Sequence, residues 1–357
     1  VQTSGGITDD AGYAITNDAN GNLFTTGFFS GTVDFNPGIG IFNLISTGYD
    51  AYILKLDNNG NFLWVKQFKA NPGSSSGLAI KLDNYKNIYL TGTFHGTVDF
   101  NTDLGVFNLY SSGLVDMFIT KIDSNGNFCW AKGVGSTYKT YGNSLDVDSH
   151  GNVYTTGSFS DNTDFDPGTG VYQLNTTAGE ETFISKLDSA GQFIWAKQFL
   201  STSDNTGNSL CIDLLGNVLT TGRSFGVTDF DPGSGVFNLT SPGSYISKLD
   251  SSGNFVWVKL IPGEGLSITT DNMGNIYSTG HFECICDFDP GPGEFILESN
   301  ALQYGAYLSK LNAAGTFVWA KPITGTQTGS TAFANCIKVD NHGNVYSCGE
   351  FEGLIDF

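Results

Sequence analysis

Gly151-Asn-Val-Tyr-Thr-Thr-Gly157 is one of six closely similar heptapeptides that recur along the 357-residue sequence. The glycine that closes each copy follows the previous one after 65, 65, 65, 58 and 69 residues. A second segment, Lys55-Leu-Asp-Asn-Asn-Gly-Asn-Phe-Leu-Trp-Val-Lys66 in its first copy, occurs five times between them. Such a period indicates one supersecondary unit repeated along the chain. The other heptapeptides lie at 21–27, 86–92, 216–222, 274–280 and 343–349.

Each repeat predicts four strands. In the first copy, residues 12–17 and 22–28 form one hairpin, and residues 51–56 and 61–68, with alternating apolar side chains, form another. Both hairpin turns carry an Asp three residues before a Gly. The carboxylate can accept backbone N–H groups across the turn, and Gly supplies the positive φ that closes it. Lys86 replaces this Gly in one turn, which we expect to be strained or differently shaped.

The predicted fold is an all-β, β-propeller of four-stranded antiparallel blades with an inserted hairpin in each blade. A four-stranded sheet cannot bury both faces alone, and stacking such sheets radially solves this problem. A linear superhelix of the same units is the structural alternative. We expect one domain, 1–357, with six blades, the last incomplete in this chain. The blades span approximately 1–70, 71–135, 136–200, 201–261, 262–323 and 324–357.

Composition restricts the partners. With 16 Lys and Arg against 35 Asp and Glu, the formal net charge is −19, which repels nucleic acid and anionic lipid surfaces. Cations are the natural small partners. No apolar stretch approaches the roughly 18 residues of a membrane span, and no signal peptide is visible. The chain begins inside a repeat, so we expect a processed or partial sequence.

The six cysteines do not recur from repeat to repeat and have no C-x-x-C spacing. A disulfide scaffold or a zinc site is therefore not expected. Cys336 and Cys348 lie on consecutive predicted strands, whose register would place them opposite one another and allow a cross-strand disulfide.

The motifs Asp-x-x-Gly-Asn-x-Tyr-x-Thr-Gly and Lys-Leu-Asp-x-x-Gly-Asn-Phe-x-Trp resemble the bacterial SBBP β-propeller repeat over essentially the whole chain. The inserted Thr163-Asp-Phe-Asp-Pro-Gly168 is similar to the version in Bacteroidota surface proteins exported by type IX secretion. This resemblance implies an extracellular or cell-surface location and no fixed activity. The sorting domain of such proteins is not visible here.

Each insertion after the second strand predicts an extra hairpin that turns at Asn-Pro-Gly or Asp-Pro-Gly. Oxygen ligands at alternating positions beside such a turn resemble half of a calcium loop, so calcium is the candidate cofactor. The alternative is that these side chains cap turns or pair with Lys, since no distal Glu follows at a fixed distance. The candidate metal ligands are Asp34 and Asn36, Asp99 and Asn101, Asp164 and Asp166, Asp229 and Asp231, and Asp287 and Asp289.

Repeated lysines and tryptophans suggest structural roles. Ten of the sixteen basic residues occupy two fixed positions per repeat, represented by Lys55 and Lys66, which favours ion pairs with repeated Asp over a basic patch. A Trp such as Trp64 at one fixed strand position favours packing between blades, although aromatic faces also stack on sugars.

The short turns share one edge of the predicted propeller, and the insertions share the other with connections of variable length. A rigid scaffold with variable loops is typical of binding surfaces, so we expect a protein or glycan partner at the insertion face. We therefore predict an interaction or adhesion module, with a scaffold, a filament subunit or assembly with other surface-protein chains as the alternative.

No enzyme is predicted. Leu-Asp-x-x-Gly-x-x-x-Trp also resembles the docking repeat of quinone-dependent dehydrogenases, but their adjacent cysteines are missing because Ile285 separates Cys284 from Cys286. No unique carboxylate pair or Gly-x-Ser-x-Gly elbow stands apart from the repeat.

Overall fold

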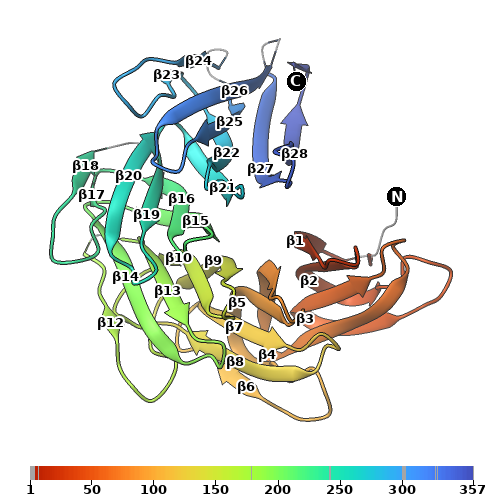
Figure 1. The fold of residues 1–357 in the computed structure, drawn as a ribbon. Coiled ribbons are helices and arrows are strands. Elements are labelled where there is room, and N and C mark those ends of the chain that lie inside the picture. Colours follow the sequence, from red (N-terminus) through yellow and green to blue (C-terminus); the bar gives the residue numbers. More distant parts are fainter. Residues whose placement is uncertain are drawn as a thin grey trace. The chain divides into compact units, whose positions relative to one another are not determined.

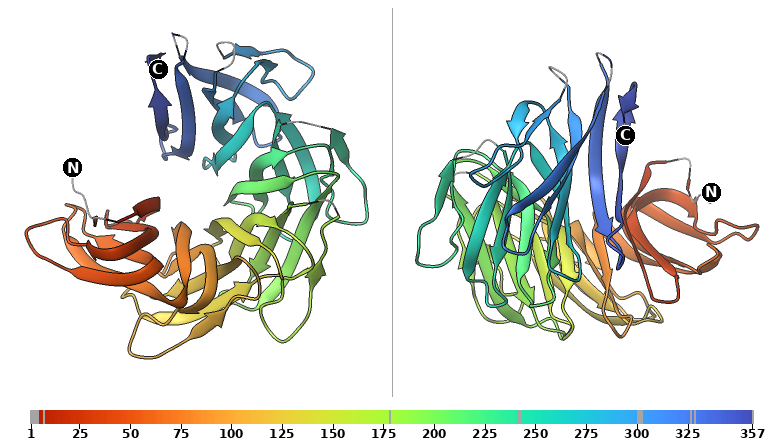
Figure 2. Two further views of the ribbon diagram at one scale, coloured as in Figure 1. Left: turned by 180° about the vertical axis from the view of Figure 1, so that it is seen from behind. Right: turned by 45° about the horizontal axis from the view of Figure 1, so that its top comes forward.

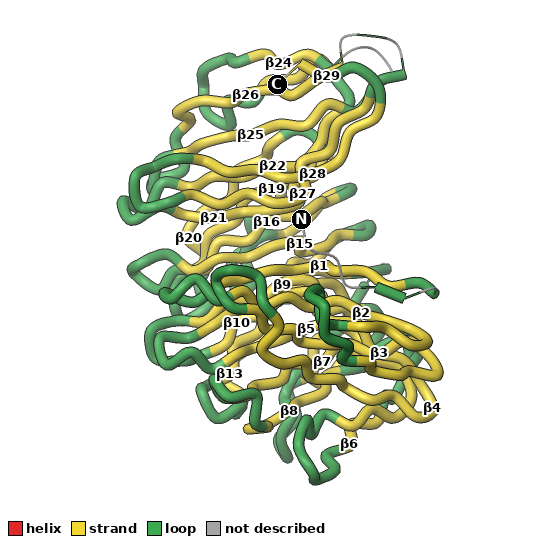
Figure 3. Tube along the Cα trace, turned by 90° about the vertical axis from the view of Figure 1, so that its right-hand side faces the viewer, coloured by secondary structure: helices red, strands yellow, loops and turns green. Residues whose placement is uncertain are grey.

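The computed structural model describes residues 5–6, 8–177, 179–240, 243–299, 303–325, 327 and 329–356. These residues form strands, turns and loops, without a helix among them (Figure 3). Accordingly, no described segment is a helix long and apolar enough to cross a membrane. The all-β prediction is confirmed.

The first blade shows how one repeat folds. β1 (Asp10–Asn17) pairs antiparallel with β2 (Leu23–Asp34), which pairs with β3 (Asn43–Leu56), which in turn pairs with β4 (Phe62–Leu82). The predicted four-strand order is therefore confirmed. β4 is long because it continues from the fourth strand of this blade into the first strand of the next.

One hydrogen-bond pattern closes the hairpin turns. In the turn at Asp57, Oδ1 of the carboxylate accepts the N–H groups of Asn59 and Asn61, each at 2.8 Å, and Gly60 adopts a φ of 82°. Lys86 keeps the same backbone bonds with a φ of 64°. Of the two outcomes expected at Lys86, the structure shows the strained turn of unchanged shape, because side chains disfavour this region of φ.

The glycine that closes each heptapeptide is required by a close approach of two strands. A Cβ on Gly92 would overlap the carbonyl oxygen of Ser76 on the neighbouring strand, beside a bulge in the register at Gly77 and Ala79. The same overlap occurs at the equivalent glycines 27, 222, 280 and 349.

The chain divides into two compact units, residues 1–175 with 185–196 and residues 176–184 with 197–357. In the first unit, the first strands of neighbouring blades, β1, the second half of β4 and β9, pack side by side (Figure 1, Figure 2). The further strands of this unit are β5 (Ile88–Asp99), β6 (Asn108–Tyr110), β7 (Asp116–Ile122), β8 (Phe128–Val134), β9 (Thr140–Val147), β10 (Val153–Phe159), β11 (Thr163–Asp164) and β12 (Gln173–Leu174). The division between the units runs through β13 (Glu181–Leu187) and β14 (Phe193–Ser201).

The second unit repeats this arrangement. Its first strands, β15, β21 and β27, pack against one another in sequence. The strands are β15 (Asn205–Ile212), β16 (Val218–Ser224), β17 (Val227–Asp229), β18 (Asn238–Thr240), β19 (Gly243–Leu249), β20 (Phe255–Ile261), β21 (Glu264–Thr270), β22 (Ile276–Phe282), β23 (Ile285–Asp287), β24 (Ile296–Glu298), β25 (Gly305–Leu311), β26 (Phe317–Gly325), β27 (Thr331–Val339), β28 (Val345–Glu352) and β29 (Ile355–Asp356).

The core lies between neighbouring sheets. In the first unit, Phe24 and Phe68 of the first blade join Ile88 and Phe118 of the second in one buried cluster. The first two blades thereby bury sheet faces against one another, as radial stacking requires. Closure into one domain and a total of six blades stay predictions.

Candidate functional site

The predicted metal ligands of the insertions build turns. Oδ1 of Asp34 accepts the N–H groups of Asn36 at 3.0 Å and Phe42 at 2.8 Å, and Oδ1 of Asn36 accepts that of Gly38 at 2.9 Å. The bonds from Phe42 and Asn36 lower the pKa of the Asp34 carboxyl. The same arrangement recurs at Asp99 and Asn101, at Asp164 and Asp166, at Asp229 and Asp231, and at Asp287 and Asp289.

These bonds explain why the acids recur: each one closes a hairpin tip through backbone N–H groups. Within the described ranges, no three His, Cys, Asp or Glu side chains gather as a metal ion would need. Calcium binding at the insertions stays a prediction.

The insertions do not remain at the edge where they begin. We call the end of a blade with the two short turns the turn edge and the opposite end the connection edge. The second insertion leaves the connection edge, yet Thr102 Oγ1 donates to Gly126 O at 3.0 Å, and Asp103 Oδ2 accepts Phe128 N–H at 3.0 Å. Gly126 closes a short turn, so the tip of the insertion lies at the turn edge.

The expectation that insertions and variable connections share one face was therefore wrong. Gly96, with a φ of 74°, turns the chain back, and Asp99 then pairs with Lys69 on the fourth strand of the preceding blade. Leu200 pairs with Asp229 in the same way. An unpaired fourth strand would leave backbone N–H and C=O groups without hydrogen-bond partners at the sheet edge, and the insertion pairs with this part of the strand.

The middle Phe of each insertion motif anchors the insertion. Phe100 is fully buried, with its ring centroid 5.5 Å from that of Phe68 in the preceding blade and 4.7 Å from that of Phe118 in its own. This role was not predicted from the sequence, although the Phe recurs in every copy. The equivalent residues Phe35, Phe165, Phe230 and Phe288 are buried as well.

Four of the five repeated strand-three lysines lie over aromatic rings, whereas the lysine of the fourth blade makes the ion pair with a repeated Asp that the sequence suggested. Lys55 Nζ lies 5.0 Å from the centroid of Phe24. In the fourth blade Leu219 occupies the ring position, and there Lys248 Nζ instead contacts Asp213 Oδ2 at 2.9 Å. Burial would raise the pKa of Asp213, but hydrogen bonds and Lys248 together lower it. Further cation–π pairs join Lys121 to Tyr89, Lys186 to Tyr154, and Lys310 to Tyr277.

The repeated tryptophans pack between blades, as expected. A Cβ on Gly191, in a turn of the third blade, would lie 3.0 Å from the Trp130 ring of the second. Trp130 Nε1 also donates to Ser189 O at 3.2 Å. The Trp257 ring lies in the same way against Gly315.

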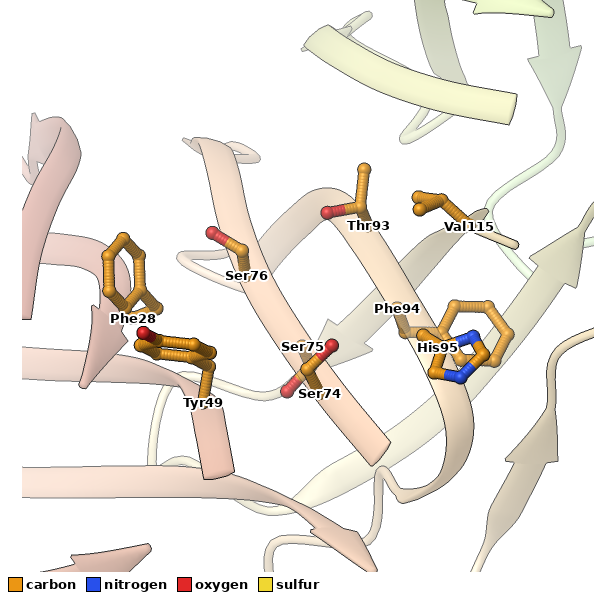
Figure 4. Close-up of a pocket in the computed structure, with 9 residues that line it drawn as sticks. All are labelled: Phe28, Tyr49, Ser74, Ser75, Ser76, Thr93, Phe94, His95 and Val115. Atoms are coloured by element: carbon orange, nitrogen blue, oxygen red, sulfur yellow. The ribbon is translucent and has the colours of Figure 1, made fainter. Parts of the chain in front are cut away.

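A cavity of about 210 Å³ opens at the connection edge of the first unit (Figure 4). Phe28 of β2 and Tyr49 of β3 form one wall, with ring centroids 5.2 Å apart and planes at 90°. Ser74, Ser75 and Ser76 of β4 lie between this wall and the opposite one, which Thr93, Phe94, His95 and Val115 build.

The polar groups of this cavity differ in their availability. Ser75 Oγ donates to Phe68 O at 3.1 Å and is buried. The hydroxyls of Ser74, Ser76 and Thr93 make no hydrogen bond within the described part of the chain. The cavity therefore combines an aromatic wall with hydroxyls that can bond to a ligand.

A second cavity, of about 460 Å³, lies at the connection edge of the second unit. Glu264 Oε2 lies 3.7 Å from Arg223 Nη1 and 4.0 Å from His281 Nε2. Burial lowers the pKa of His281, and Glu264 opposes this effect. His281 packs edge-on against Tyr304, which also lines the cavity.

One sequence position supplies residues to both cavities. The residue after the closing glycine of the heptapeptide is Phe28 or Thr93 in the first cavity and Arg223 or His281 in the second. The remaining copies have Ser158 and Glu350, so all six residues differ. Variation at one position of an otherwise repeated unit is the sequence signal that could have located these cavities.

The cysteines correct one expectation. Cys284 and Cys286, which line the second cavity, form a disulfide that was not predicted from the sequence. Cys336 and Cys348 lie opposite one another in the β27–β28 register, as predicted, but both are free thiols.

The repeated four-stranded antiparallel sheets define a β-propeller-repeat protein, and its described residues contain no helix. Residues 130–166 match the SBBP β-propeller repeat, which confirms the resemblance seen in the sequence. An uncharacterised WD repeat-containing protein of Acanthamoeba polyphaga mimivirus is 24% identical over 267 residues. That match covers 66% of this chain and 18% of the viral protein, so the chain spans about a fifth of that relative's length.

Two solved structures from bacteria are similar at 10% sequence identity. One is a protein of unknown function from Dyadobacter fermentans, with a TM-score of 0.48 and coverage of 96% of this chain and 94% of the other. The second is a DUF4221 family member from Bacteroides vulgatus, with a TM-score of 0.37 and coverage of 99% and 97%.

Proposed function

We propose that this chain is a secreted or cell-surface interaction module that holds a protein or glycan partner at its connection edge. The observation that carries this proposal is the position after the closing glycine, which differs in all six copies and lines both cavities. A rigid repeated scaffold that presents variable residues is a common design for binding surfaces.

The cavity in Figure 4 supports a ligand with one apolar and one polar face. Phe28 and Tyr49 offer ring surfaces, and Tyr49 is 44% exposed. Ser74, Ser76 and Thr93 offer hydroxyls. A sugar ring, or a hydroxyl-bearing or amide-bearing side chain of a protein, satisfies both requirements.

Charge and resemblance support the location. The net charge of −19 favours neutral or cationic partners over nucleic acid. The likeness to exported surface proteins and the Cys284–Cys286 disulfide fit an oxidising, extracellular setting, with type IX secretion as the proposed route. Detection of the chain on intact, unpermeabilised source cells tests this part, and a strictly intracellular signal would contradict it.

Arrays of glycans and proteins, probed with the whole chain, test the binding role. Phe28→Ala and Tyr49→Ala should each weaken binding at least tenfold. Tyr85→Ala is the matched control, because this ring is 80% exposed in a turn-edge hairpin. Equal binding by all three variants would contradict the cavity as the contact, and no binding by the wild-type chain would defeat the adhesion role.

A scaffold or filament role is the second candidate, and the insertions favour it. Each of the first four insertions exposes an aliphatic side chain at one repeated position: Ile41 at 77%, Val106 at 72%, Val171 at 76% and Val236 at 71%. Such a repeated apolar position could pack against another chain. Sedimentation that stays monomeric at high concentration and with surface extracts would contradict assembly through these residues.

A further inference from the structure

In three blades, the insertion pairs with the last residues of the fourth strand of the preceding blade. The residue of the fourth strand lies five positions after the repeated Trp in all three, so the pairing is a feature of the repeat. It covers one side of the first strand of the insertion hairpin. The pairs are Asp99 with Lys69, Asp229 with Leu200 and Asp356 with Thr324.

The fourth blade shows which backbone groups this pairing satisfies. The carbonyl oxygen of Val227 accepts Thr202 N–H at 3.0 Å, and the Val227 N–H group donates to Thr202 Oγ1 at 3.0 Å. Backbone direction alternates along β17, so Val227 and Asp229 face the preceding blade while Thr228 faces β18. Val227 is only 37% exposed as a result.

The fifth blade lacks this pairing, as the third does, and β23 pairs only with β24 in the described part of the chain. Cys284 and Phe288 make backbone hydrogen bonds across the hairpin at 3.1 Å and 2.9 Å. By the alternation of an antiparallel pair, the N–H and C=O groups of Ile285 and Asp287 point to the opposite side, which we call the free side of β23. Ile285, the counterpart of Val227, is 69% exposed.

A short connection explains why the fifth-blade insertion is unpaired. The chain takes twelve residues from Trp195 to Gly207 but only eight from the equivalent Trp257 to Gly265, so it must turn at once into β21. The connection also has Pro262 five positions after the Trp, and proline has no N–H group for a strand pair. β20 accordingly ends at Ile261, and no residue of the connection pairs with β23.

The cavity of about 460 Å³ in the second unit lies at this junction, because Pro262 of the connection and Cys284 and Cys286 of the insertion all line it. Arg223, the only arginine of the chain, lines it too, and its guanidinium makes no hydrogen bond within the described ranges. Glu264 Oε2 lies 3.7 Å from Arg223 Nη1. The junction therefore offers open backbone groups beside a side-chain donor and a side-chain acceptor.

We propose that the free side of β23 binds an extended segment of a partner polypeptide, which takes the place of the missing end of the fourth strand. Open N–H and C=O groups at strand spacing are complementary to another backbone, and strand addition is a common mode of peptide recognition. The fourth blade favours this occupant over a glycan, because a polypeptide segment fills the equivalent position there. The inference rests on the proposed interaction function and narrows the partner at the second cavity to a polypeptide.

Titration of the isotope-labelled whole chain with the peptide Ac-Leu-Ser-Thr-Ser-NH2, followed by NMR, tests the site. This peptide copies residues 200–203, which cover β17 in the fourth blade. The amide signals of Ile285 and Asp287 should shift saturably, whereas those of Val227 and Asp229 should not, because these residues are already paired. The peptide with an N-methylated threonine cannot make the bond of Thr202 N–H, so it should bind at least tenfold more weakly. Absence of saturable binding, or equal binding of both peptides, would overturn the proposal.

Ile285→Pro removes an N–H group from the free side and leaves the bonds to β24 in place, so it should abolish peptide binding in a folded chain. Ile285→Ala keeps the N–H group and is the matched control, with a change in affinity of less than about twofold. Circular dichroism melting checks the folding of both variants. Equal peptide binding by the two folded variants would overturn the proposal.

A longer connection tests the same site without a proline substitution. Replacing Pro262-Gly263 with Leu-Ser-Thr-Ser-Asp-Asn, the sequence of residues 200–205, restores the four missing residues. The new segment should pair with β23, slow the hydrogen exchange of the Ile285 and Asp287 amides and abolish binding of the free peptide. Unchanged peptide binding by this variant would overturn the proposal.

Two further outcomes separate this inference from related ones. Sedimentation of the chain alone as a monomer supports a different polypeptide as the partner, whereas self-association that Ile285→Pro abolishes would identify a second copy of the chain and overturn that choice. The Phe28 and Tyr49 variants alter the cavity of the first unit and leave this junction intact. Array binding that depends on those two rings, without peptide binding at β23, would defeat only this inference.

Discussion

Phe100→Ala should loosen the contact between the first two blades, because this ring is fully buried between Phe68 and Phe118. A buried Phe ring removes roughly 150 Å² from water, and at about 25 cal/mol per Å² this corresponds to about 4 kcal/mol. The retained methyl group reduces the loss and the residual cavity increases it. We therefore expect a loss of about 3–5 kcal/mol in the free energy of unfolding.

Urea denaturation followed by tryptophan fluorescence measures this loss as a lower midpoint at an unchanged slope. Phe107→Ala is the matched control, since this insertion ring is 39% exposed and stacks on Phe128 at 5.0 Å. It should cost roughly 1–2 kcal/mol, because its removal leaves no closed cavity. If Phe100→Ala costs no more than Phe107→Ala, the insertion does not fasten the blades together.

Three further predictions concern charge and backbone. Lys86→Gly should raise the free energy of unfolding by about 1 kcal/mol in urea denaturation, because Gly tolerates the φ of 64° and the lost ion pair of Lys86 with Asp18, at 3.5 Å, is partly solvated. A clear loss of stability would contradict the strain at Lys86. Lys248→Met should cost about 3–5 kcal/mol by leaving Asp213 buried without its cation. Lys55→Met should cost far less, because Lys55 lies over Phe24 and donates to Ser124 O without a direct ion pair, and equal losses would refute the distinction. Hydrogen bonds, chiefly from the Asn61 side chain, lower the pKa of turn carboxyls such as Asp57. The stabilisation they provide is present above the ordinary carboxyl pKa and is lost as pH falls through the lowered pKa, so the melting temperature should hold from pH 7 to about 5 and fall below about pH 4. A constant melting temperature down to pH 2 would contradict this prediction.

The hairpins could be predicted because their information is local. Asp57 and Gly60 lie three residues apart, and the turn they build depends only on its own backbone and side chains. Alternation of apolar residues then orients each strand. The repeat made these signals stronger, since five or six copies agree.

The candidate sites could not be predicted in the same way, because they depend on contacts between repeats. The insertion acids resembled cation ligands until the structure showed their oxygens bonded to backbone N–H groups such as that of Phe42. The connection-edge cavities draw Phe28 and Ser74 from strands of different blades. No spacing in the sequence encodes that proximity.

The four-stranded unit, its turns and the all-β class could be predicted from the order of residues, because the free energies that select them arise within a few residues of chain. The course of the insertions and the rings that the lysines cover are visible only in the folded chain, because both depend on contacts between repeats. Lys248 contacts Asp213 instead of a ring because Leu219 replaces the aromatic residue of the other blades and folding brings the two charged groups within 2.9 Å. Packing energy and desolvation depend on neighbours in space, and the order of residues along a chain does not specify those neighbours directly.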